Sequence, residues 1–230
     1  MLSKFTAFLY QKKYLTDNVC LFSFKLKDKS LDFIPGQYLM LKINDKSRLY
    51  SIASSNKNKN QFELLIELVE GGLASTYLKN LSSGDQVIFQ GPAGQFTLKS
   101  NYYKKIFLVT GTGIAPIRSM LLSNSQFLKD NSYLFWGLPY LKDVYLFDEF
   151  KQFNLKICFS REKDFSTIKD EDKKYFALGH VDEVMFDQFK NEDLNNFEFY
   201  LCGARQIVES LKEKLLAKNI AKEKIIFEKF

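Results

Sequence analysis

Apolar and polar side chains alternate at every second position through most of the first hundred residues. Short runs rich in β-branched and aromatic residues, such as NVCLFSFKLK, FELLIELVE and QVIFQGPAG, are separated by the turn-forming stretches NDKS, SNKNKN, EGG and SSGD. A period of two in short runs between turns predicts the strands of an antiparallel barrel or sandwich. One helix is expected at LASTYLKNL, directly after Gly71 and Gly72.

From Lys104 the pattern changes to apolar strands that alternate with helical segments. The expected strands include IFLV, SYLFWGLP, LKICFSRE, FEFYLCGA and KIIFEKF, and the expected helices are IAPIRSMLLS, LKDVYLFDEFKQF and RQIVESLKEKLLAKN. Strands that alternate with helices predict a parallel, doubly wound α/β sheet. We therefore expect two domains, an antiparallel β-barrel over residues 1–99 and an α/β domain over residues 103–230.

Composition narrows the classes of partner. The net charge of +6 permits an acidic partner, although an excess of Lys that only keeps the protein soluble explains the charge equally well. No cluster of Lys and Arg with interleaved aromatic residues indicates a nucleic-acid surface. The sequence shows no signal peptide and no apolar run of 18 residues, so we expect a cytoplasmic protein without a membrane span.

The cysteines exclude two kinds of metal centre. Cys20, Cys158 and Cys202 are far apart, and no C-x-x-C spacing occurs in the chain. We therefore expect no iron–sulfur cluster, no zinc site and no other bound metal.

The segment TGTGIAPIRS at residues 110–119 follows the strand IFLV and begins a helix. Glycines in such a turn let the backbone approach a ligand closely, and the start of a helix offers free N–H groups to phosphate. Pro116 stands where the dinucleotide fingerprint G-x-G-x-x-G has its third glycine. Taken alone, the segment is more typical of a tight strand-to-helix turn than of a nucleotide site at Thr112 and Gly113. Its position after the first strand of an α/β domain favours the nucleotide site.

Six motifs occur in a fixed order along the chain: RLYSIASS, GGLAST, GPAGQF, GTGIAP, CFSRE and YLCG. In this order, and across two domains of the expected kinds, the chain resembles the ferredoxin–NADP reductase family of flavoproteins. The resemblance covers the whole chain. It implies FAD and NADPH as cofactors.

The resemblance gives the stretch RLYS a role along the flavin. It implies that Arg48 meets the FAD pyrophosphate, for which a planar guanidinium is suited. Tyr50 would stack on the isoalloxazine ring, and the Ser51 hydroxyl would lie near flavin N5. The alternation of a strand puts Arg48 and Tyr50 on one face and Leu49 and Ser51 on the other. A plain strand with a surface arginine is the alternative.

GGLAS resembles the second phosphate-binding element of the family, in which the start of a helix faces the pyrophosphate. The residues concerned are Gly72, Leu73, Ala74 and Ser75. Without the neighbouring RLYS motif, a simple helix cap or glycine turn would be the better interpretation.

SRE follows the strand LKICF, where such folds contact the adenosine ribose. Ser160 and Arg161 offer a hydroxyl and a fixed cation, which suit the 2′-phosphate of NADPH. KKYF resembles the K-x-Y element of the family, in which Lys173 adds charge and Tyr175 stacks on adenine. The insertion EKDFSTIKDED weakens the assignment of Lys173 more than that of Arg161. A solvated run of charges is the alternative.

LCGA resembles the element that places a cysteine beside the nicotinamide, and it gives Cys202 and Gly203 a place at the cofactor. A cysteine at a strand end is otherwise more often a small buried apolar residue. The ending EKF resembles the glutamate–x–aromatic ending of the family. It implies that Glu228 joins Ser51 and Cys202 at the reacting centre, and that Phe230 covers the flavin face.

The resemblance therefore implies an FAD enzyme that passes electrons between NADPH and an acidic one-electron carrier, either ferredoxin or flavodoxin. Two alternatives stay open. One is an NADPH-dependent flavin reductase that treats free flavin as its substrate. The other is an electron-transfer subunit of a larger complex.

Overall fold

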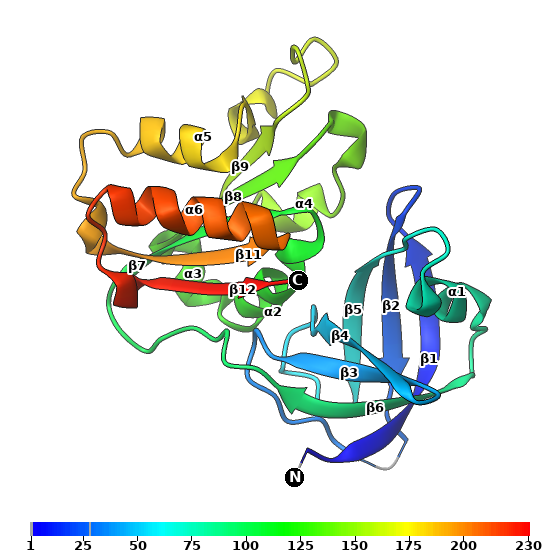
Figure 1. Cartoon of the computed structure of the whole chain (residues 1–230). Coiled ribbons are helices and arrows are strands. Elements are labelled where there is room, and N and C mark those ends of the chain that lie inside the picture. The colour runs from blue at the N-terminus through cyan, green and yellow to red at the C-terminus, as the bar shows by residue number, and fades with distance from the viewer. Residues whose placement is uncertain (1, 28) are drawn as a thin grey trace. The chain divides into compact units, whose positions relative to one another are not determined.

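The computed structural model describes residues 2–27 and 29–230 (Figure 1). Contacts divide the chain into two compact units. Unit 1 comprises Met1–Lys99 with Ala115–Asn124, and unit 2 comprises Ser100–Ile114 with Ser125–Phe230. Each unit contains a six-stranded sheet among the described residues.

The sheet of unit 1 is antiparallel throughout, in the order β4-β3-β6-β1-β2-β5. An isolated bridge between Ile52 and Leu64 joins the chain just after β4 to β5, and it closes the sheet into a barrel. The strands are β1 (Lys4–Tyr14), β2 (Val19–Lys25), β3 (Tyr38–Ile43), β4 (Lys46–Ser51), β5 (Gln61–Glu67) and β6 (Gln86–Ala93).

The barrel core consists of the residues that point inward from alternate strand positions. Four buried phenylalanine rings form its centre, with centroids 5.0–6.2 Å apart in stacked and edge-to-face pairs: Phe5, Phe24, Phe62 and Phe89. Such pairs add about 0.5–1.5 kcal/mol each beyond the area they bury. Helix α1 (Leu73–Asn80) packs Ala74 and Leu78 against the same core. Helix α2 (Ile114–Ser123) also lies mostly within unit 1.

The sheet of unit 2 is parallel throughout, in the order β10-β9-β8-β7-β11-β12. The strands are β7 (Lys104–Thr110), β8 (Ser132–Leu138), β9 (Asn154–Phe159), β10 (Phe176–Leu178), β11 (Phe197–Gly203) and β12 (Ile225–Lys229). The α-helices are α3 (Ser125–Asn131), α4 (Phe147–Phe150), α5 (Val181–Gln188) and α6 (Arg205–Ala217). The 3-10 turns are η1 (Gly111–Gly113), η2 (Leu141–Asp143), η3 (Lys173–Tyr175), η4 (Leu194–Asn196) and η5 (Lys222–Lys224).

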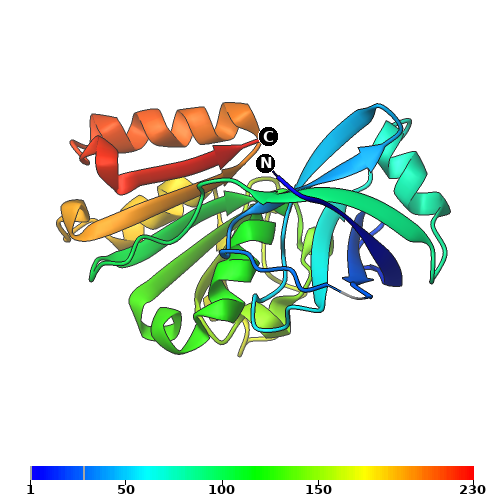
Figure 2. The ribbon, with the colours of Figure 1, turned by 90° about the horizontal axis from the view of Figure 1, so that it is seen from below.

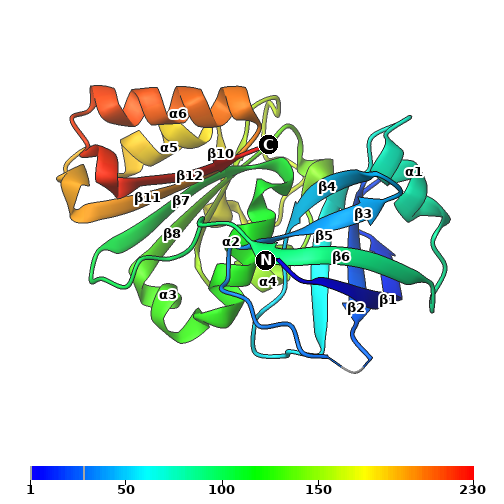
Figure 3. The ribbon, with the colours of Figure 1, turned by 60° about the horizontal axis from the view of Figure 1, so that its bottom comes forward.

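Helices cover both faces of this parallel sheet. Helices α5 and α6 share one buried cluster with alternate residues of β7, β8 and β11, and Figure 2 shows α6 running beside β12. Figure 3 shows α3 on the opposite side of the sheet. The expected order of an antiparallel barrel followed by a parallel doubly wound sheet is thus confirmed. No helix within the described residues is long and apolar enough to cross a membrane.

Residues 141–153 were expected to form one continuous helix, and the structure contradicts this. The segment contains the 3-10 turn η2 and the four-residue helix α4, separated by extended and left-handed residues. Leu146 has a φ of 52°, which an α-helix cannot accommodate. The break lets the buried Tyr145 reach the carbonyl of Gly111, so tertiary contacts override the local preference.

A buried ion pair lies between the first parts of β7 and β11. The Lys105 side chain is only 1% exposed, and its Nζ lies 2.9 Å from Oε2 of Glu198. The Asn101 side chain contacts both charged groups, and the Tyr200 hydroxyl donates to Glu198. A buried pair contributes little net stability, but removal of one partner leaves an uncompensated charge in a medium of low dielectric constant.

We expect Lys105→Met to lower the free energy of unfolding by about 3–5 kcal/mol, because Glu198 then stays buried without its cation. The double variant Lys105→Met with Glu198→Gln carries neither charge and should recover more than half of this loss. Urea unfolding followed by circular dichroism measures both variants. Equal losses in the single and double variants would contradict the explanation through a stranded charge.

Candidate functional site

Strand β4 stands at one end of the strand order of unit 1. Its register places Arg48 opposite Leu41 and Tyr50 opposite Leu39, so both side chains share the face that carries the barrel core. Leu49, which is 58% exposed, lies on the other face together with Ser51. A ligand that runs along the edge of a terminal strand can contact side chains from both faces.

Arg48 and Tyr50 differ in exposure although they are close together. The Arg48 guanidinium is exposed and donates to the carbonyl of Ser47 at 2.9 Å. Tyr50 is half-buried and packs against the barrel core. Burial raises the pKa of the Tyr50 phenol, and the positive charge of Arg48 opposes this effect. At neutral pH the strand thus presents a cation and a neutral aromatic ring.

Helix α1 begins without a side-chain cap. Its N-cap is Gly72, and the first intrahelical bond runs from Thr76 N–H to Gly72 O at 2.9 Å. The N–H groups of Leu73, Ala74 and Ser75 therefore precede the first helical hydrogen bond, which makes this end attractive to an anion. The Ser75 hydroxyl oxygen accepts from Val69 N–H at 2.9 Å and so ties the helix to the turn before it.

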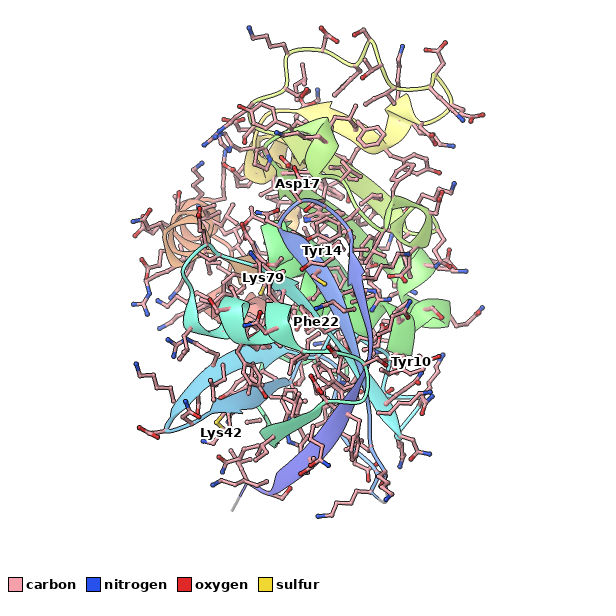
Figure 4. All side chains as sticks on the ribbon, turned by 90° about the vertical axis from the view of Figure 1, so that its right-hand side faces the viewer. Tyr10, Tyr14, Asp17, Phe22, Lys42 and Lys79 are labelled. Carbon is pink, nitrogen blue, oxygen red and sulfur yellow. The ribbon has the colours of Figure 1, made fainter. Side chains whose placement is uncertain are left out.

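The other end of α1 is held by a lysine from β1. The Lys12 ammonium donates to the carbonyl oxygens of Lys79 and Leu81 at 2.8 and 3.0 Å. Figure 4 looks onto this helix and labels Lys79 in its last turn. A cation at the C-terminus of a helix is favourable because the helix dipole is negative there. Both ends of α1 are thus fixed, and its uncapped start has a defined position in unit 1.

The sequence analysis missed Arg118 on α2. Its side chain is only 6% exposed, and its Nη1 lies 2.9 Å from the Ala53 carbonyl and 2.7 Å from Oε2 of Glu63. The next residue, Ser119, donates from Oγ to the Ser54 carbonyl at 2.7 Å. A signal was present, because Arg118 is the one charged residue in IAPIRSMLLS, but nothing in the local pattern identified its partners.

The glycine turn η1 lies at the point where the strand order of unit 2 reverses. Strand β7 begins the unit, β8 and β9 extend to one side, and β11 and β12 extend to the other. In open α/β sheets, ligands bind outside the carboxyl ends of the strands at this position. The adjacent carboxyl ends of β7 and β11 bring Thr112 and Gly113 together with Cys202 and Gly203.

Two of these glycines permit a close contact between backbones. A Cβ atom on Gly113 would lie 2.4 Å from the Cys202 carbonyl oxygen, and one on Gly203 would lie 2.3 Å from Oγ1 of Thr110. The carbonyl of the turn is also held, because the Trp136 indole and the Tyr145 hydroxyl donate to Gly111 at 3.0 and 3.2 Å. The sequence analysis identified neither Trp136 nor Tyr145.

Cys202 and Glu228 are neighbours in the pairing of β11 with β12. The Cys202 thiol is buried, and burial together with the charge of Glu228 raises its pKa. The thiol is therefore neutral and poorly nucleophilic at physiological pH. Phe230 lies at the same edge, where its backbone forms hydrogen bonds with Gly203 and Arg205. The residue is 63% exposed.

Ser160 and Arg161 follow directly after β9, also at the carboxyl edge of the sheet. Their N–H groups donate to the carbonyls of Leu138 and Pro139 at 3.1 Å each. Both residues are exposed. The backbone is thus fixed beside the end of β8, while the side chains stay open to a ligand.

The structure does not place Lys173 and Tyr175 level with Arg161. Both lie in η3, just before β10, whose first residue pairs with Ile157 in the middle of β9. Arg161 lies four residues beyond Ile157 along the chain and two residues past the end of β9. The Lys173 ammonium pairs with Asp170 at 2.6 Å, and the Tyr175 ring packs edge-on against Phe147. Their role at the adenosine stays a prediction.

The residues present fit a dinucleotide flavin in unit 1 and a nicotinamide nucleotide in unit 2. Unit 1 offers an exposed guanidinium and a half-buried aromatic ring on β4, and the uncapped start of helix α1. These groups match a pyrophosphate and a flat ring system. Unit 2 offers a tight glycine turn at the switch point and an exposed arginine at the adjacent strand end. Among the described residues, no group of three or more His, Cys, Asp or Glu could hold a metal ion.

Two family models match the chain. Residues 6–98 match an oxidoreductase FAD-binding domain, and residues 107–213 match an oxidoreductase NAD-binding domain. The matches follow one another without overlap and together span most of the sequence.

Among curated proteins, the chain is 30% identical over 205 residues to the toluate 1,2-dioxygenase electron transfer component of Pseudomonas putida, covering 87% of this chain and 59% of that protein. It is also 30% identical over 214 residues to the anthranilate 1,2-dioxygenase electron transfer component of Acinetobacter baylyi, covering 88% and 59%. The chain thus spans 58–59% of the length of the first curated relatives it matches.

Solved structures share the fold. The ferredoxin reductase in carbazole 1,9a-dioxygenase superposes with a TM-score of 0.85 at 20% identity, covering 100% of this chain and 70% of that one. A ferredoxin NADP+ reductase from Neisseria gonorrhoeae with bound FAD and NADP gives a TM-score of 0.81 at 18% identity, covering 98% of both chains.

The buried thiols predict a loss of stability at alkaline pH. Burial raises the pKa of Cys20 to about 11 and that of Cys158 to about 12, and the pKa of Cys202 is also raised. Above the ordinary value of 9.0, the unfolded chain releases these protons while the folded chain keeps them. Folding stability should therefore fall as pH rises, by about 1.4 kcal/mol per pH unit for each thiol.

Cys202→Ala isolates one of these contributions, because other titrating groups are common to both proteins. The difference in unfolding free energy between the wild type and the variant should shrink between pH 9 and pH 11, as measured by urea unfolding. A difference that stays constant over this range would show that the Cys202 thiol titrates normally.

Proposed function

Because the chain belongs to the ferredoxin–NADP reductase family of FAD- and NAD-binding oxidoreductases, we propose that it passes electrons between NADPH and a one-electron protein carrier through FAD. The observation that carries this proposal is the combination of three features in one chain. Unit 1 contains β4 with the RLYS motif and the uncapped helix α1, and unit 2 contains a glycine turn at the switch point of its sheet. We take residues 1–99 as the FAD-binding domain and residues 103–230 as the NAD(P)-binding domain.

In unit 1 the side chains of β4 hold and orient the flavin. FAD, when bound, supplies the chemistry of taking up a hydride and releasing single electrons. The Arg48 guanidinium neutralises the pyrophosphate, together with the N–H groups of residues 72–75. Tyr50 gives the ring a flat, half-buried surface, and Leu49 lies along the edge of the strand. The Ser51 hydroxyl would offer a hydrogen bond to the flavin ring when FAD is bound.

In unit 2 the carboxyl edge of the sheet holds the nicotinamide nucleotide. The turn at Thr112 and Gly113 and the adjacent Gly203 let the backbone approach the nucleotide. Cys202 offers a small neutral contact rather than a nucleophile, which is consistent with its raised pKa. The negative charge of Glu228 lies next to it in the sheet and favours the positive charge of an oxidised nicotinamide.

Five further side chains of unit 2 complete the proposed cofactor sites. Ser160 and Arg161 bind the 2′-phosphate of NADPH, which their exposure at the strand end supports. The ring of Phe230 is exposed and available for stacking on the flavin. Lys173 and Tyr175 are proposed for the adenosine on the resemblance alone.

The distribution of charge supports an acidic carrier, such as a ferredoxin or flavodoxin, that meets unit 1. Unit 1 contains 14 Lys and Arg against 8 Asp and Glu, whereas unit 2 contains 19 of each kind. The whole net charge of +6 thus belongs to the unit with the flavin strand. A field of this sign speeds the approach of an acidic protein.

A second candidate is an electron-transfer component of a larger assembly. The relatives named as dioxygenase electron transfer components favour it. Both candidates share the flavin and nucleotide sites and differ only in the acceptor. A cytoplasmic location stays a prediction from the sequence.

The flavin assignment is tested by Arg48→Ala. The variant should purify with at least tenfold less FAD, because a charge-assisted contact to phosphate contributes about 1.5–3 kcal/mol. Lys13→Ala removes an exposed cation elsewhere on the barrel and serves as the control. The ratio of visible flavin absorbance to protein measures both. A wild type that takes up no flavin would refute the proposed function, and an unchanged ratio in Arg48→Ala would refute only the role of this arginine.

The preference for NADPH is tested by Arg161→Ala. Loss of the cation should weaken NADPH binding by about 10- to 150-fold and leave NADH nearly unaffected, because only NADPH carries the 2′-phosphate. Equilibrium titration with both nucleotides measures the change. Equal losses for the two nucleotides would mean that Arg161 does not contact the phosphate.

The carrier assignment is tested by salt and by charge reversal. Reduction of an acidic carrier should slow as ionic strength rises past about 0.15 M, where the screening length is about 8 Å. Lys46→Glu, on the exposed start of β4, should raise the KM for the carrier more than Lys222→Glu, which makes the same change in unit 2. A rate that is independent of salt would favour free flavin or another neutral acceptor.

A further inference from the structure

Arg118 is a buried cation that the proposed chemistry does not use. Its side chain lies inside unit 1, and its Nη1 contacts both the Ala53 carbonyl and the Glu63 carboxylate at 2.9 and 2.7 Å. A guanidinium is well suited to this task, because it offers several donors in a fixed plane and stays charged when buried. Such a group is retained in an interior only where its partners are fixed.

Arg118 contacts the continuation of β4, the strand that is proposed to bind the flavin. Residues 52–54 follow Ser51 without a break and close the barrel against β5. Ala53 N–H donates to Glu63 O at 2.8 Å, and Glu63 N–H donates to Oγ of Ser54 at 3.0 Å. Glu63 therefore holds the segment through its backbone and holds Arg118 through its carboxylate.

Helix α2 holds the same segment from its other side. Ser119 donates to the Ser54 carbonyl at 2.7 Å, and Oγ of Ser123 accepts from Asn56 N–H at 3.2 Å. The chain after Ser51 is thus clamped between β5 and α2, and Arg118 is the one member of the clamp that contacts both Ala53 and Glu63. Tyr50 and Ser51 lie only two or three residues before this clamp.

We propose that Arg118 is a positioning residue for the flavin: it fixes the segment after β4 and thereby the placement of Tyr50 and Ser51 against the ring. The inference rests on the proposed function, since it requires that β4 binds FAD. Arg118 itself does not touch the cofactor in this assignment. Its loss should change the environment and reactivity of the ring while the phosphates stay bound through Arg48 and α1.

The test compares Arg118→Met, Arg118→Lys and Glu63→Gln with the wild-type holoenzyme. Arg118→Met removes both contacts, Arg118→Lys keeps the charge without the planar fork, and Glu63→Gln weakens only the carboxylate contact. The control is the double variant Lys105→Met with Glu198→Gln, which removes a more deeply buried ion pair from unit 2. Readouts are FAD content, visible circular dichroism of the flavin, and the rate of flavin reduction by NADPH in the absence of oxygen.

We expect all variants to retain FAD and to bind NADPH with a KM within about twofold of the wild type. The limiting rate of flavin reduction in Arg118→Met should fall by about 10- to 100-fold, the range that a displacement of about 1 Å produces. Its flavin circular dichroism should change as well. Arg118→Lys and Glu63→Gln should lie between Arg118→Met and the wild type, and the control should match the wild type in both readouts.

Four results would overturn the inference. Wild-type dichroism and reduction rates in Arg118→Met would show that the clamp does not position the ring. Equal changes in the control would show a general effect of lost stability. If Arg118→Met does not fold, wild-type values in both Arg118→Lys and Glu63→Gln would count against it in the same way. A wild-type chain that binds no FAD would remove the proposed function and this inference together.

Discussion

The close contact between the glycine turn and the end of β11 is the constraint on which the nucleotide edge of unit 2 depends. The two parallel strands β7 and β11 are adjacent, so the chain that leaves β7 must pass directly beside the end of its neighbour. Gly113 and Gly203 make this possible, because a side chain at either position would collide with the opposite segment. The carbonyl of Gly111 is held in turn by Trp136 and Tyr145. A rigid turn is the result.

Two cations are buried among the residues that the structure describes, and they illustrate different uses of the same physical cost. Lys105 joins two strands near their amino ends, on the side of the sheet away from the carboxyl edge. Arg118 instead lies where the barrel closes, and its partners are the chain just after the flavin strand and a strand that pairs with it. A buried charge that must stay paired fixes the position of its neighbours. If a partner moved away, the charge would be left unpaired in a medium of low dielectric constant. At the end of β4 that rigidity is what the proposed positioning of the flavin requires.

The separation of charge between the units matches a separation of tasks. The unit with the neutral balance carries the turn and the exposed arginine that suit a small nucleotide, for which local contacts are enough. Unit 1, with its excess charge of +6, contains β4, the strand proposed to bind the flavin. Long-range attraction matters most for a large partner protein, because such a partner must find one face of this unit. The distribution follows from composition along the chain, but its meaning requires the boundaries that the contacts define.

The sequence by itself determined the two kinds of sheet, their order along the chain and the position of each motif within them. The period of two in RLYS already placed Arg48 and Tyr50 on one face, because alternation is a local property of a strand. The buried strand before GTG likewise indicated a turn at the start of an α/β unit. Such features depend on neighbours within a few positions, and the residues themselves record them.

The tertiary structure alone decided which distant residues meet. It placed β11 beside β7, bent the chain at Leu146 so that Tyr145 reaches Gly111, and left Lys173 and Tyr175 away from the level of Arg161. It also paired Arg118 with Glu63 and Ala53, which lie 55 and 65 positions earlier in the chain. A hydrophobic period specifies which side of an element is buried but not which element covers it. That choice depends on the packing of the whole unit.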